Sequence, residues 1–225
     1  MAIGFKVRTQ IPRVSIPNIE RFRTLPVANV SDAMSRLLGG GCTLRPMHKN
    51  GILAGPALTV KTRPGDNLML HKAIDIAQPG DVIVVDAGGD LTNSLMGELM
   101  LEHAIMRGIA GFVLNGAIRD AQAIYDRNLP LYALGITHRG PYRTGPGEIG
   151  YPIAIEGMVI QPGALILGDL DGVVCINHEQ LDEVHQGASA KHAAETKQME
   201  ITKNQTIDRS WVDKELIKLG CVFEN

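Results

Sequence analysis

Short apolar runs alternate with longer stretches of helical spacing through the middle of the chain. Val82–Val85 is wholly apolar, as is typical of a strand buried on both faces, and mostly apolar runs follow at Ala110–Asn115 and Leu131–Leu134. Between them, apolar residues recur at helical intervals over 91–107, and a shorter helix is expected to end at Arg127. This order of strand, helix, strand, helix and strand predicts a mixed α/β domain.

Capping and turn residues predict further elements ahead of this series. We expect about the first 17 residues to form an arm. A helix that carries Met34, Leu37 and Leu38 is predicted next; Ser31 or Asp32 would cap its start, and Gly39–Gly41 would end it. A strand is expected over Ala57–Thr62. A second helix is expected over Leu68–Ala77, with Asp66 or Asn67 as its cap.

The second half of the chain combines hairpin signals with a helical end. Glu156-Gly157 separates two short apolar runs, and Asp171-Gly172 separates two more, as is typical of β-hairpins. The strands expected are Ile153–Ile155, Met158–Ile160, Ala164–Leu167 and Val173–Ile176. Helices are expected over about 178–202 and 211–219, so that 178–225 is a helical extension of one domain spanning 1–225.

Composition narrows the class of protein. The 225 residues carry a formal charge of −2 with a pI near 6.4, which argues against a nucleic-acid-binding surface. No apolar run approaches the ~20 residues of a membrane helix. Cys42, Cys175 and Cys221 are odd in number and form no C-x-x-C, so neither a disulfide framework nor a zinc–thiolate site is expected. We therefore expect a cytoplasmic protein that binds neither nucleic acid nor a membrane.

An adjacent cation and anion follow one of the predicted buried strands. Arg119-Asp120 comes directly after Gly116-Ala117-Ile118, past the end of the Ala110–Asn115 strand. Ligands of α/β sheets collect at the carboxyl ends of strands, where a guanidinium can hold a carboxylate or an enolate and a carboxylate can hold a divalent cation. A surface ion pair is the alternative, and the residues alone leave both interpretations open.

A glycine interrupts the helical pattern of 91–107. Gly97 within a helix costs about 1 kcal/mol relative to Ala, so it predicts a packing or functional requirement. One interpretation is close packing against a strand. The other is that the chain breaks there, which leaves segments 91–96 and 99–107 and turns the N–H groups of Glu98, Leu99 and Met100 toward a carboxylate.

Two further patterns carry less information. Gly88-Gly89-Asp90 lies between a strand and a helix, where free N–H groups can bind an anion or form a plain turn. His185, His192 and Glu195 share one face of the predicted C-terminal helix and could ligate a metal. Because they lack the H-E-x-x-H spacing, a solvated helix face is the favoured interpretation.

An ordered set of motifs runs through the chain from about Asn29 to Val174. Its members are Val84–Asp90, Gly97–Met100, Gly111–Asp120, Pro162-Gly163, Gly168-Asp169 and Asp171–Val174. Together they resemble the RraA-like family. That family includes 4-hydroxy-4-methyl-2-oxoglutarate/4-carboxy-4-hydroxy-2-oxoadipate aldolases and the RraA regulators of ribonuclease E. The resemblance implies a swivelling β/β/α fold, with a central mixed sheet or partial barrel flanked by helices. It also implies a trimer, or a hexamer of two trimers, with the active site between subunits.

The resemblance also implies roles for individual residues. The Gly97–Met100 segment (Gly97, Glu98, Leu99, Met100) is expected to bind the pyruvyl carboxylate through backbone N–H groups. Glu98 takes the acidic position that contacts metal-bound water. Arg119 is expected to contact the keto oxygen of the substrate, and Asp120 to be the direct metal ligand. A glutamate from the C-terminal region of a neighbouring chain completes the site, and Glu195, with Glu200 behind it, is the candidate.

The implied activity is that of a class II pyruvate aldolase, a carbon–carbon lyase. Mg²⁺ or Mn²⁺ is the implied cofactor, and a 4-hydroxy-2-oxo acid is cleaved to pyruvate and a second oxo acid. Oxaloacetate decarboxylation through the same enolate is the expected side activity. The alternative is a non-catalytic regulator of the ribonuclease E inhibitor type. The acid after Arg119 and the long C-terminal region favour the enzyme. A methyltransferase is supported only by the Gly88-Gly89 loop.

Overall fold

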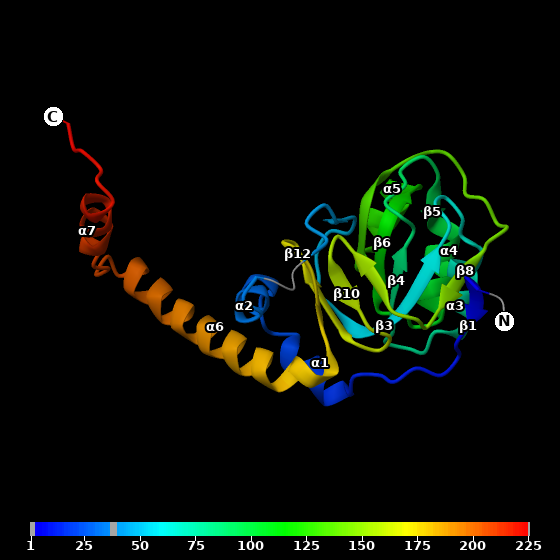
Figure 1. Ribbon diagram of the computed structural model, residues 1–225, viewed down its shortest axis with the longest axis horizontal. Helices are drawn as coiled ribbons and strands as arrows, with labels where there is room; N and C mark the ends of the chain where they lie inside the picture. The colour runs from blue at the N-terminus through cyan, green and yellow to red at the C-terminus, as the bar shows by residue number, and fades with distance from the viewer. Residues whose placement is uncertain (1–2, 37–39, 225) are drawn as a thin grey trace.

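A ten-stranded mixed sheet forms the centre of the protein, which is described by a computed structural model over residues 3–36 and 40–224 (Figure 1). The strands are β1 Phe5–Val7, β2 Arg45–Pro46, β3 Leu53–Thr62, β4 Val82–Asp86, β5 Ser94–Met96, β6 Gly111–Ile118, β7 Leu131–Ile136, β8 Gly147–Ile149, β9 Ile153–Ile155, β10 Met158–Ile160, β11 Leu165–Asp169 and β12 Gly172–Ile176. The helices are α1 Ile16–Phe22, α2 Val27–Ala33, α3 Leu68–Ile76, α4 Glu98–Met106, α5 Ala121–Arg127, α6 Leu181–Lys203 and α7 Ser210–Lys218, with a 3₁₀ turn at His178–Gln180.

The strand order along the sheet is β1-β8-β3-β4-β6-β7-β2, and parallel strands occupy its middle. β3, β4, β6 and β7 are parallel neighbours, and β11 extends the sheet from the first half of β3 and forms a hairpin with β12. Every residue of β4 is buried, which is why its sequence is a continuous apolar run. The mixed α/β class, with a central mixed sheet flanked by helices, is confirmed.

Three apolar clusters hold four layers together. The first lies between one face of the sheet and α3, α4 and α5. The second cluster joins the opposite face to the β9–β10 and β11–β12 hairpins. The third joins the β11–β12 hairpin to α1, α2 and the first turns of α6. The layers therefore run helix, sheet, hairpins, helix, and the carboxyl ends of the parallel strands share one edge.

The N-terminal arm is bound to the sheet rather than free. β1 pairs in parallel with β8, and Ile11 and Val14 are buried. Arg13 binds the buried carboxylate of Asp81 through two hydrogen bonds, at 2.8 and 2.9 Å. This pairing raises the pKa of Arg13 and fixes the arm beside the turn that leads into β4.

The prediction of a helix that starts at Ser31 or Asp32 is wrong. The helix there is α2, Val27–Ala33, so it ends where the predicted one begins. Ser35 and Arg36 adopt positive φ values of 56° and 58°, which stops the helix. Asp32 binds the side chains of Arg36 and Lys191 instead of capping. Leu37, Leu38 and Gly39 of the predicted helix lie outside the described residues.

The prediction of one helix over 91–107 is also wrong, whereas the alternative break at Gly97 is confirmed. β5 occupies Ser94–Met96 and pairs with the end of β6, and α4 starts directly after Gly97. Pairing with β6 buries Ser94, Leu95 and Met96 completely, so tertiary contacts override the helical spacing of the leucines.

The C-terminal extension, as far as the structure describes it, buries apolar residues against the rest of the molecule only through its first turns. α6 packs against α1 and α2 through Leu181, Val184 and Ala188, and its remaining turns project away from the sheet and lead to α7 (Figure 1). The predicted helices of 178–202 and 211–219 are thus confirmed. No helix in the described ranges is both long and apolar enough to cross a membrane.

Candidate active site

A cavity of about 260 Å³ lies where β5 and α4 meet the end of β6 and the first turn of α3. Most of the residues that the sequence singles out line it. Its lining comprises Asn67, His71, Met96, Gly97, Leu99, Met100, Arg119, Asp120, Pro141 and Arg143. The break in the chain at Gly97 and the Arg-Asp pair after β6 are therefore parts of one site.

Gly97 allows this convergence because it has no side chain. Its backbone is extended, so the requirement for glycine is one of space. A Cβ atom at this position would lie 2.3 Å from Oδ2 of Asp120 and 3.0 Å from Cγ of Arg119. Any other residue would push the Arg-Asp pair away from the start of α4.

Asp120 is held in an unusual backbone conformation at the start of α5. Its φ of 54° and ψ of 39° are left-handed, a region that costs a non-glycine residue about 1 kcal/mol. The conformation turns the carboxylate back toward α4, where Oδ2 accepts a hydrogen bond from the N–H of Glu98 at 3.0 Å. The side chain is 43% exposed, so its other oxygen is accessible to a ligand.

Arg119 lies between the cavity and a neighbouring loop. Its N–H donates to the carbonyl of Met96 at 3.0 Å, which continues the β5–β6 pairing. The Nε atom is 3.8 Å from Oδ2 of Asp120, and the side chain is 40% exposed. The guanidinium is therefore only loosely paired with Asp120 and retains donors for an anionic ligand.

The first turn of α4 supplies backbone donors. The N–H of Glu98 is taken by Asp120, whereas the N–H groups of Leu99 and Met100 have no partner in the described part of the chain. Free N–H groups at the positive end of a nine-residue helix favour an anion. The predicted carboxylate site thus retains two of its three expected donors.

The opposite wall is formed by α3 and the loop before β8. Asn67, the residue that precedes α3, and His71 on its first turn both line this wall together with Arg143. Burial lowers the pKa of His71 and the charge of Arg143 lowers it further, so the imidazole is neutral near pH 7. The sequence also offers His71, His138 and Arg143 as contacts for the second half of a substrate. His71 and Arg143 line this cavity, whereas His138 does not. Asn67 stood out only as a cap.

The two glutamates assigned to proton transfer are not brought into the cavity wall. The side chain of Glu98 is exposed beside it. Glu195 lies on α6, where its Oε2 accepts a hydrogen bond from Asn29 of α2 at 2.6 Å, and Glu200 lies further along the same helix. Because α6 projects away from α4 and β5 (Figure 1), a single chain does not place Glu195 beside Arg119.

The ligand set at Asp120 fits a cation that keeps most of its water. Asp120 is a hard oxygen donor, and its Oδ1 has no hydrogen-bond partner in residues 3–36 and 40–224. In the same residues no three His, Cys, Asp or Glu side chains cluster in a way that would enclose a metal. The ring of His185 packs edge-on against that of Phe22, with 5.2 Å between the ring centroids, so His185 contributes to the packing of α6 on α1 and does not lie on a fully solvated helix face. A single carboxylate oxygen that leaves the other ligand positions to water suits Mg²⁺ or Mn²⁺.

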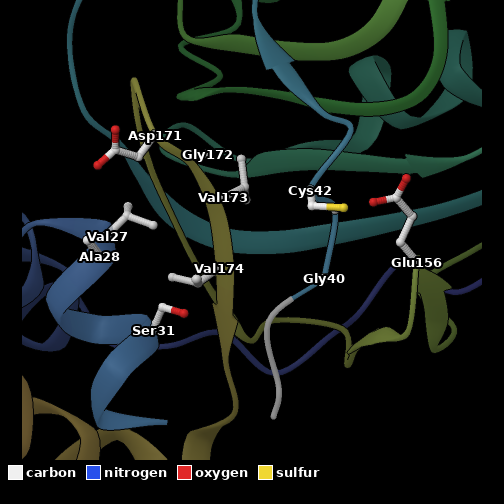
Figure 2. A pocket seen from close by; sticks show the side chains of 11 residues that line it. Val27, Ala28, Ser31, Gly40, Cys42, Glu156, Asp171, Gly172, Val173 and Val174 are labelled. Atoms are coloured by element: carbon white, nitrogen blue, oxygen red, sulfur yellow. The ribbon is translucent and has the colours of Figure 1, made fainter. Parts of the chain in front are cut away.

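A second cavity, of about 360 Å³, lies between α2, β12 and the β9–β10 turn (Figure 2). It contains the thiol of Cys42 and the carboxylates of Glu156 and Asp171. Figure 2 shows Glu156 and Asp171 on opposite sides of the cavity. Thr43 binds Glu156 and holds the pKa of its carboxyl below the usual range, although partial burial opposes this. None of the predicted site residues lines this cavity.

Comparison with known proteins identifies relatives over most of the chain. The model of the RraA-like family, described as Aldolase/RraA, matches residues 27–175. A protein of Halalkalibacterium halodurans named "Putative 4-hydroxy-4-methyl-2-oxoglutarate aldolase" is 41% identical over 203 residues, which cover 90% of this chain and 97% of that protein.

Solved structures share the fold. The crystal structure of an uncharacterized protein from Pseudomonas syringae pv. tomato superposes with a TM-score of 0.77 and 26% identity, covering 86% of this chain and 95% of that chain. The RNA-processing inhibitor RraA from Thermus thermophilis superposes with a TM-score of 0.62 and 27% identity, covering 67% and 92%. The site residues 97–120 lie inside the segment that the family model matches, and the segment after residue 175 lies outside it.

Proposed function

The chain belongs to the RraA-like family, and we propose that it is a divalent-metal-dependent lyase that cleaves a 4-hydroxy-2-oxo acid into pyruvate and a second oxo acid. The observation that supports this proposal most is the convergence of Arg119, Asp120 and the free N–H groups of α4 on one cavity. The relative named as an aldolase supports the same class of reaction.

The pyruvyl half of the substrate binds at the start of α4. Its carboxylate accepts hydrogen bonds from the N–H groups of Leu99 and Met100, at the positive end of the helix. Gly97 keeps this end open toward Arg119. The keto oxygen then lies within reach of the guanidinium of Arg119.

Asp120 is the residue that would hold the cation. A bound divalent ion supplies a Lewis acid that draws electron density from the keto group. The N–H of Glu98 orients the carboxylate through Oδ2 and leaves Oδ1 for the ion. Exposure of the Asp120 side chain lets the ion enter from solvent.

Cleavage requires removal of the proton of the C4 hydroxyl. The C3–C4 bond then breaks, C4 becomes the carbonyl carbon of the second oxo acid, and the electron pair passes to the enolate of pyruvate. Arg119 stabilises the negative charge on the enolate oxygen, and a proton added at C3 completes pyruvate. We assign the proton transfers to Glu98 and to Glu195 of the partner subunit. Decarboxylation of oxaloacetate passes through the same enolate and is the expected side activity.

Glu195 can serve the reaction only from another copy of the chain. We therefore propose a trimer or a hexamer of single-domain chains, in which the N-terminal arm of about residues 1–17 stays on its own sheet and the extension of 178–225 reaches a neighbour. Mg²⁺ or Mn²⁺ and a small 2-oxo acid are the proposed ligands. A role as a non-catalytic regulator is the competing outcome of the tests.

The direct test is release of pyruvate from 4-hydroxy-4-methyl-2-oxoglutarate and from oxaloacetate. We expect release from both with Mg²⁺ or Mn²⁺, and its loss after treatment with EDTA. The control is restoration of activity when metal is returned in excess of the chelator. Absence of release from both substrates at high protein concentration with metal present contradicts the proposal and favours a binding protein.

A further inference from the structure

The cavity has a second cationic wall that the proposed chemistry does not use. Arg143 lines it and has no acidic partner in an ion pair among the described residues, unlike Arg119, which is 3.8 Å from Asp120. His71 beside it is neutral near pH 7, because burial and the charge of Arg143 both lower its pKa. Asp75, one turn further along α3, acts on His71 in the opposite direction but does not line the cavity. Among the residues that line this wall, Arg143 carries the full charge, and it is available to bind an anion.

The wall that carries Arg143 is anchored firmly to the rest of the site. Asn67 is 1% exposed, and its Nδ2 donates to the carbonyl of Leu95 at 2.9 Å. The backbone N–H of Asn67 donates to the carbonyl of Tyr142, the residue before Arg143, at 3.0 Å. These bonds connect the start of α3 to β5 and to the loop of Arg143. The spacing of Arg143 from the start of α4 is thus built into the fold.

Asp66 fixes the other side of the same loop. It is fully buried, and its Oδ2 accepts hydrogen bonds from the N–H groups of Thr144 at 2.7 Å and Gly145 at 2.9 Å. Its Oδ1 accepts one from the N–H of Leu68 at 3.0 Å. Arg143 therefore follows a residue bound to Asn67 and precedes two residues bound to Asp66. The backbone from which the Arg143 side chain extends is therefore held in place at the mouth of the cavity.

We propose that Arg143 binds a second carboxylate of the substrate, at the end that leaves as the second oxo acid, and so determines specificity. The inference rests on the proposed function, which places the first carboxylate at the start of α4. Guanidinium groups bind carboxylates through two parallel hydrogen bonds, and an arginine without an acidic partner needs no bond broken first. Loss of one such charge-assisted contact is expected to cost roughly 10–100-fold in affinity.

The test compares two unreactive probes of equal chain length. 2-Oxoglutarate carries a carboxylate where 2-oxopentanoate carries a methyl group, and neither has the hydroxyl that cleavage requires. Dissociation constants are measured by isothermal titration calorimetry with Mg²⁺ present. The unmodified protein is expected to bind 2-oxoglutarate roughly 10–100-fold more tightly, and Arg143→Met to abolish that preference while leaving 2-oxopentanoate binding unchanged. Arg143→Lys should restore part of it.

Arg139→Met is the matched control, because it removes the same charge from the same loop outside the cavity lining. It should leave both dissociation constants unchanged. Equal weakening of both probes by Arg143→Met, or a preference that survives it, overturns the inference. The measurement does not depend on turnover. A preference that Arg143→Met removes, in a protein that releases no pyruvate from any substrate, would contradict the proposed function and leave the assignment of Arg143 standing.

Discussion

The body of the protein, up to residue 176, and the C-terminal extension, from residue 178, bury their apolar residues to very different degrees. Three clusters of buried residues fill the body. The extension contributes only Leu181, Val184 and Ala188 to them. Further along, α7 has no buried residue, and Trp211 and Leu219 are 64% and 75% exposed. Apolar burial within one chain therefore accounts for the stability of the body. Among the described residues, α7 buries nothing against it, and α6 beyond Ala188 adds only polar contacts such as the hydrogen bond from Asn29 to Glu195.

The same division applies to the candidate active site. Gly97, Arg119 and Asp120 lie in the body and are positioned by its sheet. Glu195 lies on the outer part of α6, among exposed residues. Apolar surface left exposed at this scale is typical of protein–protein contacts, which supports the proposed oligomer. This difference in burial favours the proposal made above, in which the body is stable alone and the extension serves the site of another chain.

Shortening the chain so that it ends at Ala190 tests whether the outer part of the extension contributes to the stability of its own body. This version keeps every residue of the extension that is buried in the body and removes Glu195 and α7. We expect complete loss of pyruvate release, with a thermal unfolding midpoint close to that of the full chain. Differential scanning calorimetry and the pyruvate assay measure the two quantities. A large fall in the midpoint would show that the extension stabilises its own body.

Arg119→Ala should reduce turnover without affecting folding. Loss of one donor to the enolate oxygen is expected to lower kcat by roughly 10²–10³-fold, as for other oxyanion donors. The side chain is 40% exposed, so its removal leaves no large buried space. Steady-state kinetics with Mg²⁺ measure the effect. A change confined to KM would instead make Arg119 a residue that binds substrate and transition state equally.

Asp66→Asn should produce the smallest effect, which we expect mainly on the stability of the body, because Asp66 holds the loop of Arg143 but does not line the cavity. Burial raises the pKa of Asp66, but hydrogen bonds from Leu68, Thr144 and Gly145 outweigh it and lower the pKa below the ordinary value. A carboxyl with a lowered folded pKa stabilises the protein above its unfolded pKa, near 4, and loses that contribution as pH falls toward the folded value. We expect the variant to lose about 1–3 kcal/mol of unfolding free energy at pH 7.

The matched control for this change is Asp208→Asn in the extension. Asp208 also has a lowered pKa, from hydrogen bonds to Ser210, but it is exposed. Denaturant unfolding should give the same free energy for this variant and the unmodified protein between pH 3 and pH 7. Equal destabilisation by both variants would contradict the view that the body alone carries the stability.

The fold could be predicted from sequence wherever a strand is buried on both faces. The runs that form β4 and β6 have no polar face, which only a central strand tolerates. β5 could not be predicted, because Leu91, Leu95 and Leu99 keep helical spacing while pairing with β6 makes the segment a strand. α2 was misplaced because Ser31 and Asp32 have the chemistry of caps and lie near its end.

The candidate site was predictable in the body and less so beyond it. Arg119 and Asp120 follow a strand, and Gly97 interrupts a pattern, so local signals bring attention to all three. The role of Asn67 and Arg143 in the cavity depends on how α3 and the loop before β8 fold together, which no local pattern records. The position of Glu195 in an assembly depends on contacts between chains.

Mixing two inactive variants tests most directly whether the body of one chain and the extension of another share a site. Arg119→Ala and Glu195→Gln chains are refolded together in equal amounts. Since each site draws these two residues from different chains, about one quarter of the sites should regain both. We therefore predict metal-dependent pyruvate release well above that of either variant alone.

The control mixture combines Arg119→Ala with Asp120→Asn, both in the body, and should stay inactive because every site then lacks one of the two residues. Recovery in the first mixture and none in the control is the result that the account predicts. An inactive first mixture, or full activity of Glu195→Gln by itself, would contradict it.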